Sequence, residues 1–243
     1  MKDIDLRYQT VLFGNFEDIG PKPETLKYFI DKFSDKELIP TTFQELTPQG
    51  PINRFSLITS DEVWLLEFSS NRLDIQKTNK NVGLTKMGTL EQFIIDIKRM
   101  IKIIDEKFPR KFNRLSLVTR YLLKPMVDKE FSVIYNKLNN SIDIYKNNEI
   151  ADWKNRTVSR IPYQVDKSEE LFNVISEIKR TKGTLSINSK VEKIDRVELH
   201  FDINTYQGNT DFRFDCNLFD SFIDVAYKLE SELKTKYLKF IES

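Results

Sequence analysis

The chain has 243 residues, 40% of them hydrophobic and 31% charged, which is typical of a folded globular protein with a core of normal size. Its 38 Lys and Arg residues nearly balance 37 Asp and Glu residues, for a net charge of +1. This balance argues against a dedicated nucleic-acid or membrane binder, because such proteins depend on excess positive charge. We therefore expect no membrane partner, and nucleic acid is an open but less favoured partner.

Three absences in the sequence bear on compartment and cofactors. Cys216 is the only cysteine and cannot form an internal disulfide, which favours a reducing compartment. The first residues show no apolar signal region, and no apolar run approaches the roughly 18–20 residues needed to span a bilayer. No Walker-type loop, GxGxxG, HExxH or paired CxxC motif is present. We expect a cytoplasmic protein without a cofactor.

The first half of the chain alternates strand and helix patterns. Residues 7–13 predict an opening strand, and apolar spacing predicts a helix at 24–33. Residues 34–51 contain three prolines and a glycine and predict a loop. A hairpin is expected from strands 53–60 and 62–77. Its apolar side changes near 69–71, which indicates a bulge or a second turn.

Helical periodicity then predicts a helix over 89–108, where Thr89 and Gln92 fit a capping box. The remaining elements follow in chain order. We expect a strand at 113–124, strands at 131–135 and 156–165, polar loops at 139–140 and 147–148, a helix at 168–180 broken by Gly183, a strand at 184–189, a strand at 195–206 and a last helix at 217–241.

Strand periodicity without regular βαβ alternation predicts an α+β fold. Its largely antiparallel sheet or sheets would pack against two long helices, 89–108 and 217–241. Strands precede a helix of about 20 residues in each half, which is consistent with duplicated halves 1–125 and 126–243. No residue-level repeat and no linker are visible, so we expect a single domain spanning 1–243.

The strand predicted at 195–206 carries the most distinctive polar face. Glu198, His200 and Asp202 alternate with apolar residues, and His200 is the only histidine of the chain. A carboxylate–imidazole pair can perform acid–base catalysis or bind a metal. Neighbouring side chains on one face are roughly 7 Å apart and need groups from another element to converge. The favoured alternative is the solvated face of an antiparallel sheet.

Several cations are candidates for binding an anion. The stretch 98–114 is the most basic part of the chain, and it either contacts phosphate or forms a solvated helix face that suits the helix dipole. Arg120 lies mid-strand, and it is either paired with a carboxylate or lines a ligand groove. The candidate anion-binding residues are Arg120, Lys98, Arg99, Lys102, Arg110, Lys111 and Arg114.

Cys216 comes just before the predicted C-terminal helix. The N-terminus of a helix can lower the pKa of a thiol and activate it. Such a site needs a nearby base, for which His200 is the sole imidazole candidate. An incidental or structural thiol is the simpler interpretation, which we favour.

Short stretches of the chain resemble those of a sporadically distributed family of uncharacterised bacterial proteins of about this length. They are 55–60, 73–75, the helix from Thr89, Arg120-Tyr121 and 201–203. The family pattern implies a strand hairpin, a helix, a strand ending in Arg-Tyr, an Asp-bearing strand and a C-terminal amphipathic helix. Leu123 stands where that family usually has Asn, and the last helix lacks a family-like His. The resemblance implies an architecture, no chemistry, and a place in a bacterial accessory or defence cassette.

Two functional hypotheses follow. The first is a non-enzymatic binding or assembly module that acts through protein partners or self-association, because no catalytic motif is present and aromatic residues are abundant. The alternative is a metal- or phosphate-handling enzyme that uses the polar face of 195–206. Its catalytic residues would be His200, Glu198 and Asp202, with Arg120 or the basic stretch holding an anion. The convergence of these groups discriminates between the two hypotheses.

Overall fold

The computed structural model describes the chain except for residues 1, 140–142, 147, 149 and 243, so the loops predicted at 139–140 and 147–148 lie partly outside the described residues. The elements are β1 Ile4–Phe13, α1 Pro23–Lys32, a 3-10 turn Ser34–Lys36, β2 Leu38–Thr47, β3 Gly50–Thr59, β4 Trp64–Ser69, β5 Arg72–Thr78, α2 Leu90–Lys107, β6 Arg114–Leu122, α3 Asp128–Leu138, α4 Asp143–Lys146, β7 Lys154–Val165, β8 Ser168–Ile187, β9 Lys190–Thr205 and α5 Cys216–Glu242.

The strands of the described residues form one nine-stranded sheet in the order β2-β3-β4-β5-β1-β6-β9-β8-β7. Every neighbouring pair is antiparallel. The central pair joins β1 to β6, with register from Ile4 opposite Leu122 to Phe13 opposite Arg114. Strands β2–β5 extend the sheet beyond β1, and β7–β9 extend it beyond β6. The α+β class with an antiparallel sheet is therefore confirmed.

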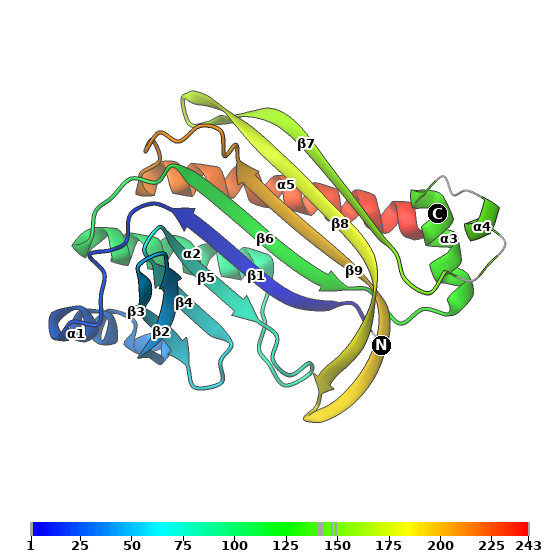
Figure 1. Ribbon diagram of the computed structural model, residues 1–243, viewed down its shortest axis with the longest axis horizontal. Helices are drawn as coiled ribbons and strands as arrows, with labels where there is room; N and C mark the ends of the chain where they lie inside the picture. Colours follow the sequence, from blue (N-terminus) through cyan, green and yellow to red (C-terminus); the bar gives the residue numbers. More distant parts are fainter. Residues whose placement is uncertain (1, 140–142, 147, 149, 243) are drawn as a thin grey trace.

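Helices α2 and α5 lie on the same face of the sheet, behind the strands in Figure 1. Alternating apolar side chains of the strands pack beneath them. Phe93 of α2 stacks on Trp64 with ring centroids 5.6 Å apart, and Phe222 of α5 meets Phe172 at 5.3 Å. We call this side the covered face. The opposite side, which faces the viewer in Figure 1 and is covered by no helix of the described residues, is the open face.

The helix predicted at 168–180 is wrong, because these residues belong to strand β8. Buried side chains such as Phe172, Val174 and Ile178 recur at every second or fourth position and pack on the covered face. Pairing with β7 on one side and β9 on the other satisfies the backbone of β8, which overrides local helix propensity. Asp166, just before these residues, has a left-handed backbone (φ 54°) in the turn between β7 and β8.

The strand predicted at 131–135 is also wrong, because it lies within helix α3. The Glu130 carboxylate accepts a hydrogen bond from the backbone N–H of Val127 at 2.8 Å, which stabilises the start of this helix. Phe131 and Ile134 are buried at helical spacing. A short apolar run fits either structure, and the capping contact decides between them.

The loop predicted over 34–51 contains the edge strand β2 and the start of β3. Pro40 is tolerated there because β2 pairs only with β3 and its other edge needs no donor. Of the two alternatives expected near 69–71, a bulge or a second turn, the structure has the turn, which separates β4 from β5. Gly183, expected to end a helix, lies within β8, which also contains most of the strand predicted at 184–189.

The core of α5 is testable by matched truncations. We expect Leu229→Ala to lower the free energy of unfolding by about 2–5 kcal/mol, because Leu229 is only 9% exposed and its loss leaves a cavity. Leu46→Ala is the control, because Leu46 is 84% exposed and surface substitutions change stability by about 0.5 kcal/mol or less. Urea unfolding of both variants measures the difference, and equal stabilities would contradict the packing of α5.

Candidate functional site

Strand β9 presents the predicted polar residues on the open face. Glu198, His200 and Asp202 alternate there with Leu199 and Phe201, which are fully buried on the covered face. The register places Arg120 of β6 opposite His200 on one side and Glu177 of β8 opposite it on the other. The structure therefore brings Arg120 beside the predicted triplet, and it adds Glu177, which the sequence analysis did not single out.

The glutamates on this face form ion pairs with lysine and arginine side chains, most of them on adjacent strands. Glu198 lies 3.4 Å from the ammonium of Lys179 and 3.8 Å from Nε of Arg120. Glu177 lies 2.6 Å from Lys154 and 3.6 Å from Lys179. Burial raises the pKa of Glu177, but the hydrogen bond and charge of Lys154, together with the charge of Lys179, lower it overall. These ion pairs form a lattice across the sheet and do not converge on one point.

Asp202 belongs to a chain of hydrogen bonds between neighbouring strands. Its Oδ1 accepts from the hydroxyl of Ser116 at 2.8 Å and from Nδ2 of Asn204 at 2.9 Å. Asn173 then donates to Oδ1 of Asn204 at 3.0 Å and to Oε1 of Gln207 at 2.7 Å. The Asp202 carboxylate therefore has partners from the protein itself, as buried polar groups require.

His200 lies between charges of opposite sign and, within the described residues, makes no side-chain hydrogen bond or ion pair. Burial, followed by the positive charge of Arg120, lowers its pKa below the ordinary value of 6.5, and Glu177, Asp202 and Glu198 oppose this shift. The imidazole is thus neutral at pH 7. The described part of the chain contains no group of three or more His, Cys, Asp or Glu able to hold a metal ion, so the metal alternative has no ligand set there.

The basic stretch 98–114 does not form one anion site. Its cations point in different directions, and most are paired with carboxylates of other elements. Lys98 pairs with Asp224, Arg99 with Asp35, Lys102 with Asp220 and Arg110 with Asp18. Lys98 and Lys102 thereby join α2 to α5. Arg114 lies over the ring of Phe13 at 4.7 Å, and Lys111 is exposed without an ion pair in the described residues.

Arg120 has a second arginine beside it. Arg7 of β1 lies opposite Arg120 in the register of β1 and β6. Burial, and then the charge of Arg120, lowers the pKa of Arg7, while Asp74 and Glu67 oppose the shift. Sequence analysis missed Arg7 because its proximity to Arg120 depends on pairing between strands more than 100 residues apart.

Cys216 begins α5 and is 8% exposed. Burial, reinforced by the negative charge of Asp105, raises the pKa of its thiol to about 11. This shift is opposite to the activation that a helix N-terminus can provide. His200 lies on the open face of the sheet, whereas α5 covers the other face. The two residues therefore do not form a thiol–imidazole pair.

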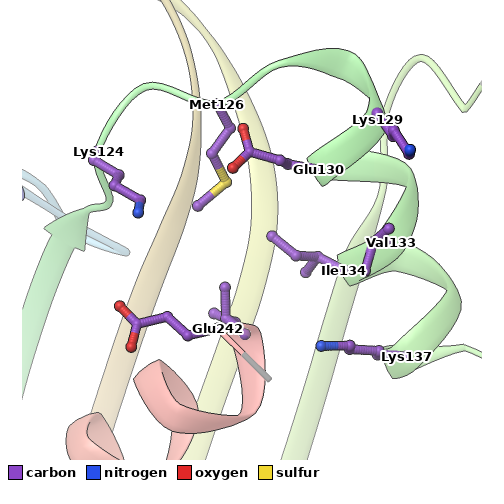
Figure 2. A pocket seen from close by; sticks show the side chains of 9 residues that line it. Lys124, Met126, Lys129, Glu130, Val133, Ile134, Lys137 and Glu242 are labelled. Carbon is purple, nitrogen blue, oxygen red and sulfur yellow. The ribbon is translucent and has the colours of Figure 1, made fainter.

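A groove between α3 and the end of α5 is a different kind of site, with a volume of about 540 Å³. Met126, Val133 and Ile134 give it an apolar lining together with Ile241 of α5. Figure 2 shows Met126 and Ile134 directed into this space, with the lysines at its margin and Glu242 below. We call it the α3–α5 groove; its lysines are Lys124, Lys129 and Lys137.

The α3–α5 groove combines exposed apolar surface with an excess of positive charge, because three lysines and two carboxylates, Glu130 and Glu242, line it. Val127 and Val133 are 65% and 44% exposed. Within the described residues none of the three lysines forms an ion pair, and Lys137 donates to the carbonyl of Phe240 at 3.3 Å. Sequence analysis missed this groove because it assigned 131–135 to a strand. The helical spacing of Phe131 and Ile134, which leaves Val133 on the outer side, was the signal that could have revealed it.

The single histidine makes the electrostatics of the open face measurable by NMR. We expect the imidazole of His200 to titrate below pH 6.5, with a higher pKa in Arg120→Met and a lower one in Glu177→Gln, because these changes remove opposite charges. A folded-state pKa below the unfolded value means that the stability from His200 is present above about pH 6.5 and is lost as the pH falls. A midpoint above 6.5, or shifts of reversed sign, would contradict this arrangement.

No helix in the described part of the chain is long and apolar enough to cross a membrane. No protein-family model, curated protein or solved structure matches the chain. The resemblance to a bacterial family therefore stays a prediction from the sequence, and the function must be argued from the geometry of the sites.

Proposed function

We propose that the protein is a non-enzymatic binding module that acts through a protein partner, and that the α3–α5 groove holds this partner. One observation carries the proposal: an apolar recess of about 540 Å³ opens at the surface beside the exposed Val127 and Val133. Apolar surface of this kind is characteristic of interaction sites, because the free energy falls when a partner covers an apolar side chain that was exposed to water.

The charges around the groove define the chemistry of its partner. Lys124, Lys129 and Lys137 have no carboxylate partner in the described residues, and Glu130 is already engaged by the backbone of Val127. A protein segment with an apolar anchor and acidic flanking residues complements both features. A nucleic-acid backbone would match the lysines only, since it has no apolar group to fill the recess.

The open face supports a non-enzymatic role. Glu177 and Glu198 are held by cations on neighbouring strands, and Asp202 accepts hydrogen bonds from Ser116 and Asn204. Catalysis by His200 requires a second group directed at the same reacting atom. The neighbouring carboxylates are already paired with groups on adjacent strands, which leaves no such group in the described residues. These contacts stabilise the sheet without a ligand.

We also propose that the chain arose by duplication. The series β1, α1, β2–β5, α2 is followed by β6, α3, α4, β7–β9, α5. In both series the first strand is central, the second lies at an edge of the sheet, and the later strands return inward until the last one pairs with the first. This order favours a boundary between α2 and β6, before the division at 125/126 expected from the sequence. A role in a bacterial accessory or defence cassette rests on the family resemblance alone.

The groove is testable with two substitutions of the same chemistry. We expect Val133→Asp to abolish capture of the partner in pull-downs from the native host, because it places a carboxylate on the apolar lining. Val191→Asp is the matched control, because Val191 is 78% exposed and lies in β9, outside the groove. Static light scattering of both variants and the wild type determines whether the partner is a second copy of the chain.

The result that supports the proposal is a protein, or a dimer, retained by the wild type and Val191→Asp but lost in Val133→Asp. Lys137→Glu should weaken the same complex and make it less sensitive to salt, because it reverses one charge at the margin. Identical captured proteins and identical masses for all variants would overturn the assignment of the groove.

A further inference from the structure

Lys77 of β5 is a buried lysine that has no counterion among the described residues. Its backbone pairs with Tyr8 of β1 and Trp64 of β4, and its side chain lies on the covered face. Lys77 is only 8% exposed. Within the described residues its ammonium forms no hydrogen bond or ion pair, and its close partner is the ring of Trp64, 5.1 Å from Nζ to the centroid. An isolated buried charge is costly, so this position favours the neutral amine.

The Lys77 side chain lines a recess with a volume of about 610 Å³. Trp64 and Val63 supply apolar wall, and Lys36, Asp61 and Lys86 add polar groups. A methyl group built at Gly88, whose φ is +67°, would lie 3.6 Å from Nζ of Lys77. Gly88 therefore leaves the space next to the amine open. The volume suits a small organic molecule.

The electrostatics of the recess agree with this geometry. Burial has the largest effect and lowers the pKa of Lys77. The positive charge of Lys36 lowers this pKa further, whereas the negative charges of Asp96 and Asp61 raise it. Asp96 is largely occupied by Lys36, whose Nζ lies 2.8 Å from Oδ1. A lysine that is both desolvated and close to another cation is the arrangement that turns an amine into a nucleophile near neutral pH.

We propose that Lys77 is a nucleophilic lysine that captures a small aldehyde or ketone as a Schiff base in this recess. The lone pair of Nζ forms a bond to the carbonyl carbon, and the carbonyl oxygen takes up a proton to give a carbinolamine. Loss of that oxygen as water, with the nitrogen proton, leaves the C=N bond. The reaction releases one water and needs no oxidant or reductant.

The recess favours a neutral carbonyl compound over an anion. Asp35, Glu37 and Asp61 also line it, and their carboxylates repel an anion. Lys36 is already paired with Asp96, so the three carboxylates face only Lys77 and Lys86 as further cations of the lining. This inference is independent of the α3–α5 groove. The recess lies against β4 and β5, on the other side of β1 from strands β6–β9.

Reductive trapping tests the proposal on the unmodified protein. The probe is propionaldehyde at a limiting concentration with sodium cyanoborohydride at pH 7, followed by peptide mass spectrometry. We expect several-fold more alkylation at Lys77 than at Lys80, an exposed lysine paired with Glu62. Each unit by which the pKa is lowered raises the neutral-amine fraction about tenfold. Alkylation of Lys77 no greater than that of Lys80 would overturn the proposal.

Two variants of the recess should shift the trapping rate in opposite directions. Asp96→Asn removes a negative charge that raises the pKa of Lys77, so trapping at pH 7 should become faster. Lys36→Met removes a neighbouring cation, so trapping should become slower. Circular dichroism verifies that both variants are folded. Rates that change in the same direction, or protection of Lys77 by inorganic phosphate without preferential alkylation, would identify a merely structural or anion-binding lysine and overturn the proposal.

Discussion

The structure depends on a sheet that is covered on one face only. Helices α2 and α5 both lie on that face, so the polar side chains of the strands gather on the other face, where they pair with one another. They do so along the pairing direction, through Lys154–Glu177 and Lys179–Glu198 ion pairs and the hydrogen bonds around Asp202. This requirement explains why a strand with a histidine between two carboxylates does not form a converging site.

Two of the buried titratable groups on the covered face, Glu230 and Lys77, have different surroundings. Burial raises the pKa of Glu230 on α5, but Oε1 accepts hydrogen bonds from Tyr121 at 2.6 Å and Thr119 at 3.0 Å, and the carboxyl group ties the helix to β6. Lys77 is similarly buried, but within the described residues its ammonium has only the ring of Trp64 as a close partner. A buried polar group with partners stabilises the fold, whereas one without partners costs stability and calls for another explanation.

The two proposed sites lie where the regular packing of helices on the sheet ends. The α3–α5 groove forms because α5 continues to Glu242 and its last turn meets α3 outside the sheet. The recess of Lys77 forms at the ends of β4 and β5, next to the segment that precedes α2. Both sites therefore have walls from segments distant in sequence, and neither leaves a compact motif in the chain.

The sequence by itself determined the α+β class, the hydrophobic stripe and cap of α2 at Thr89, and the alternation that separates His200 from Phe201. These features depend on local periodicity and short-range hydrogen bonds. The sequence could not decide whether 168–180 is a helix or a strand, because the spacing of Val174 and Ile178 fits both. Only pairing with β7 and β9 made it β8. The tertiary structure likewise decided which charges pair, and that Lys77 has no ion pair among the described residues, because such contacts depend on register between strands far apart in the chain.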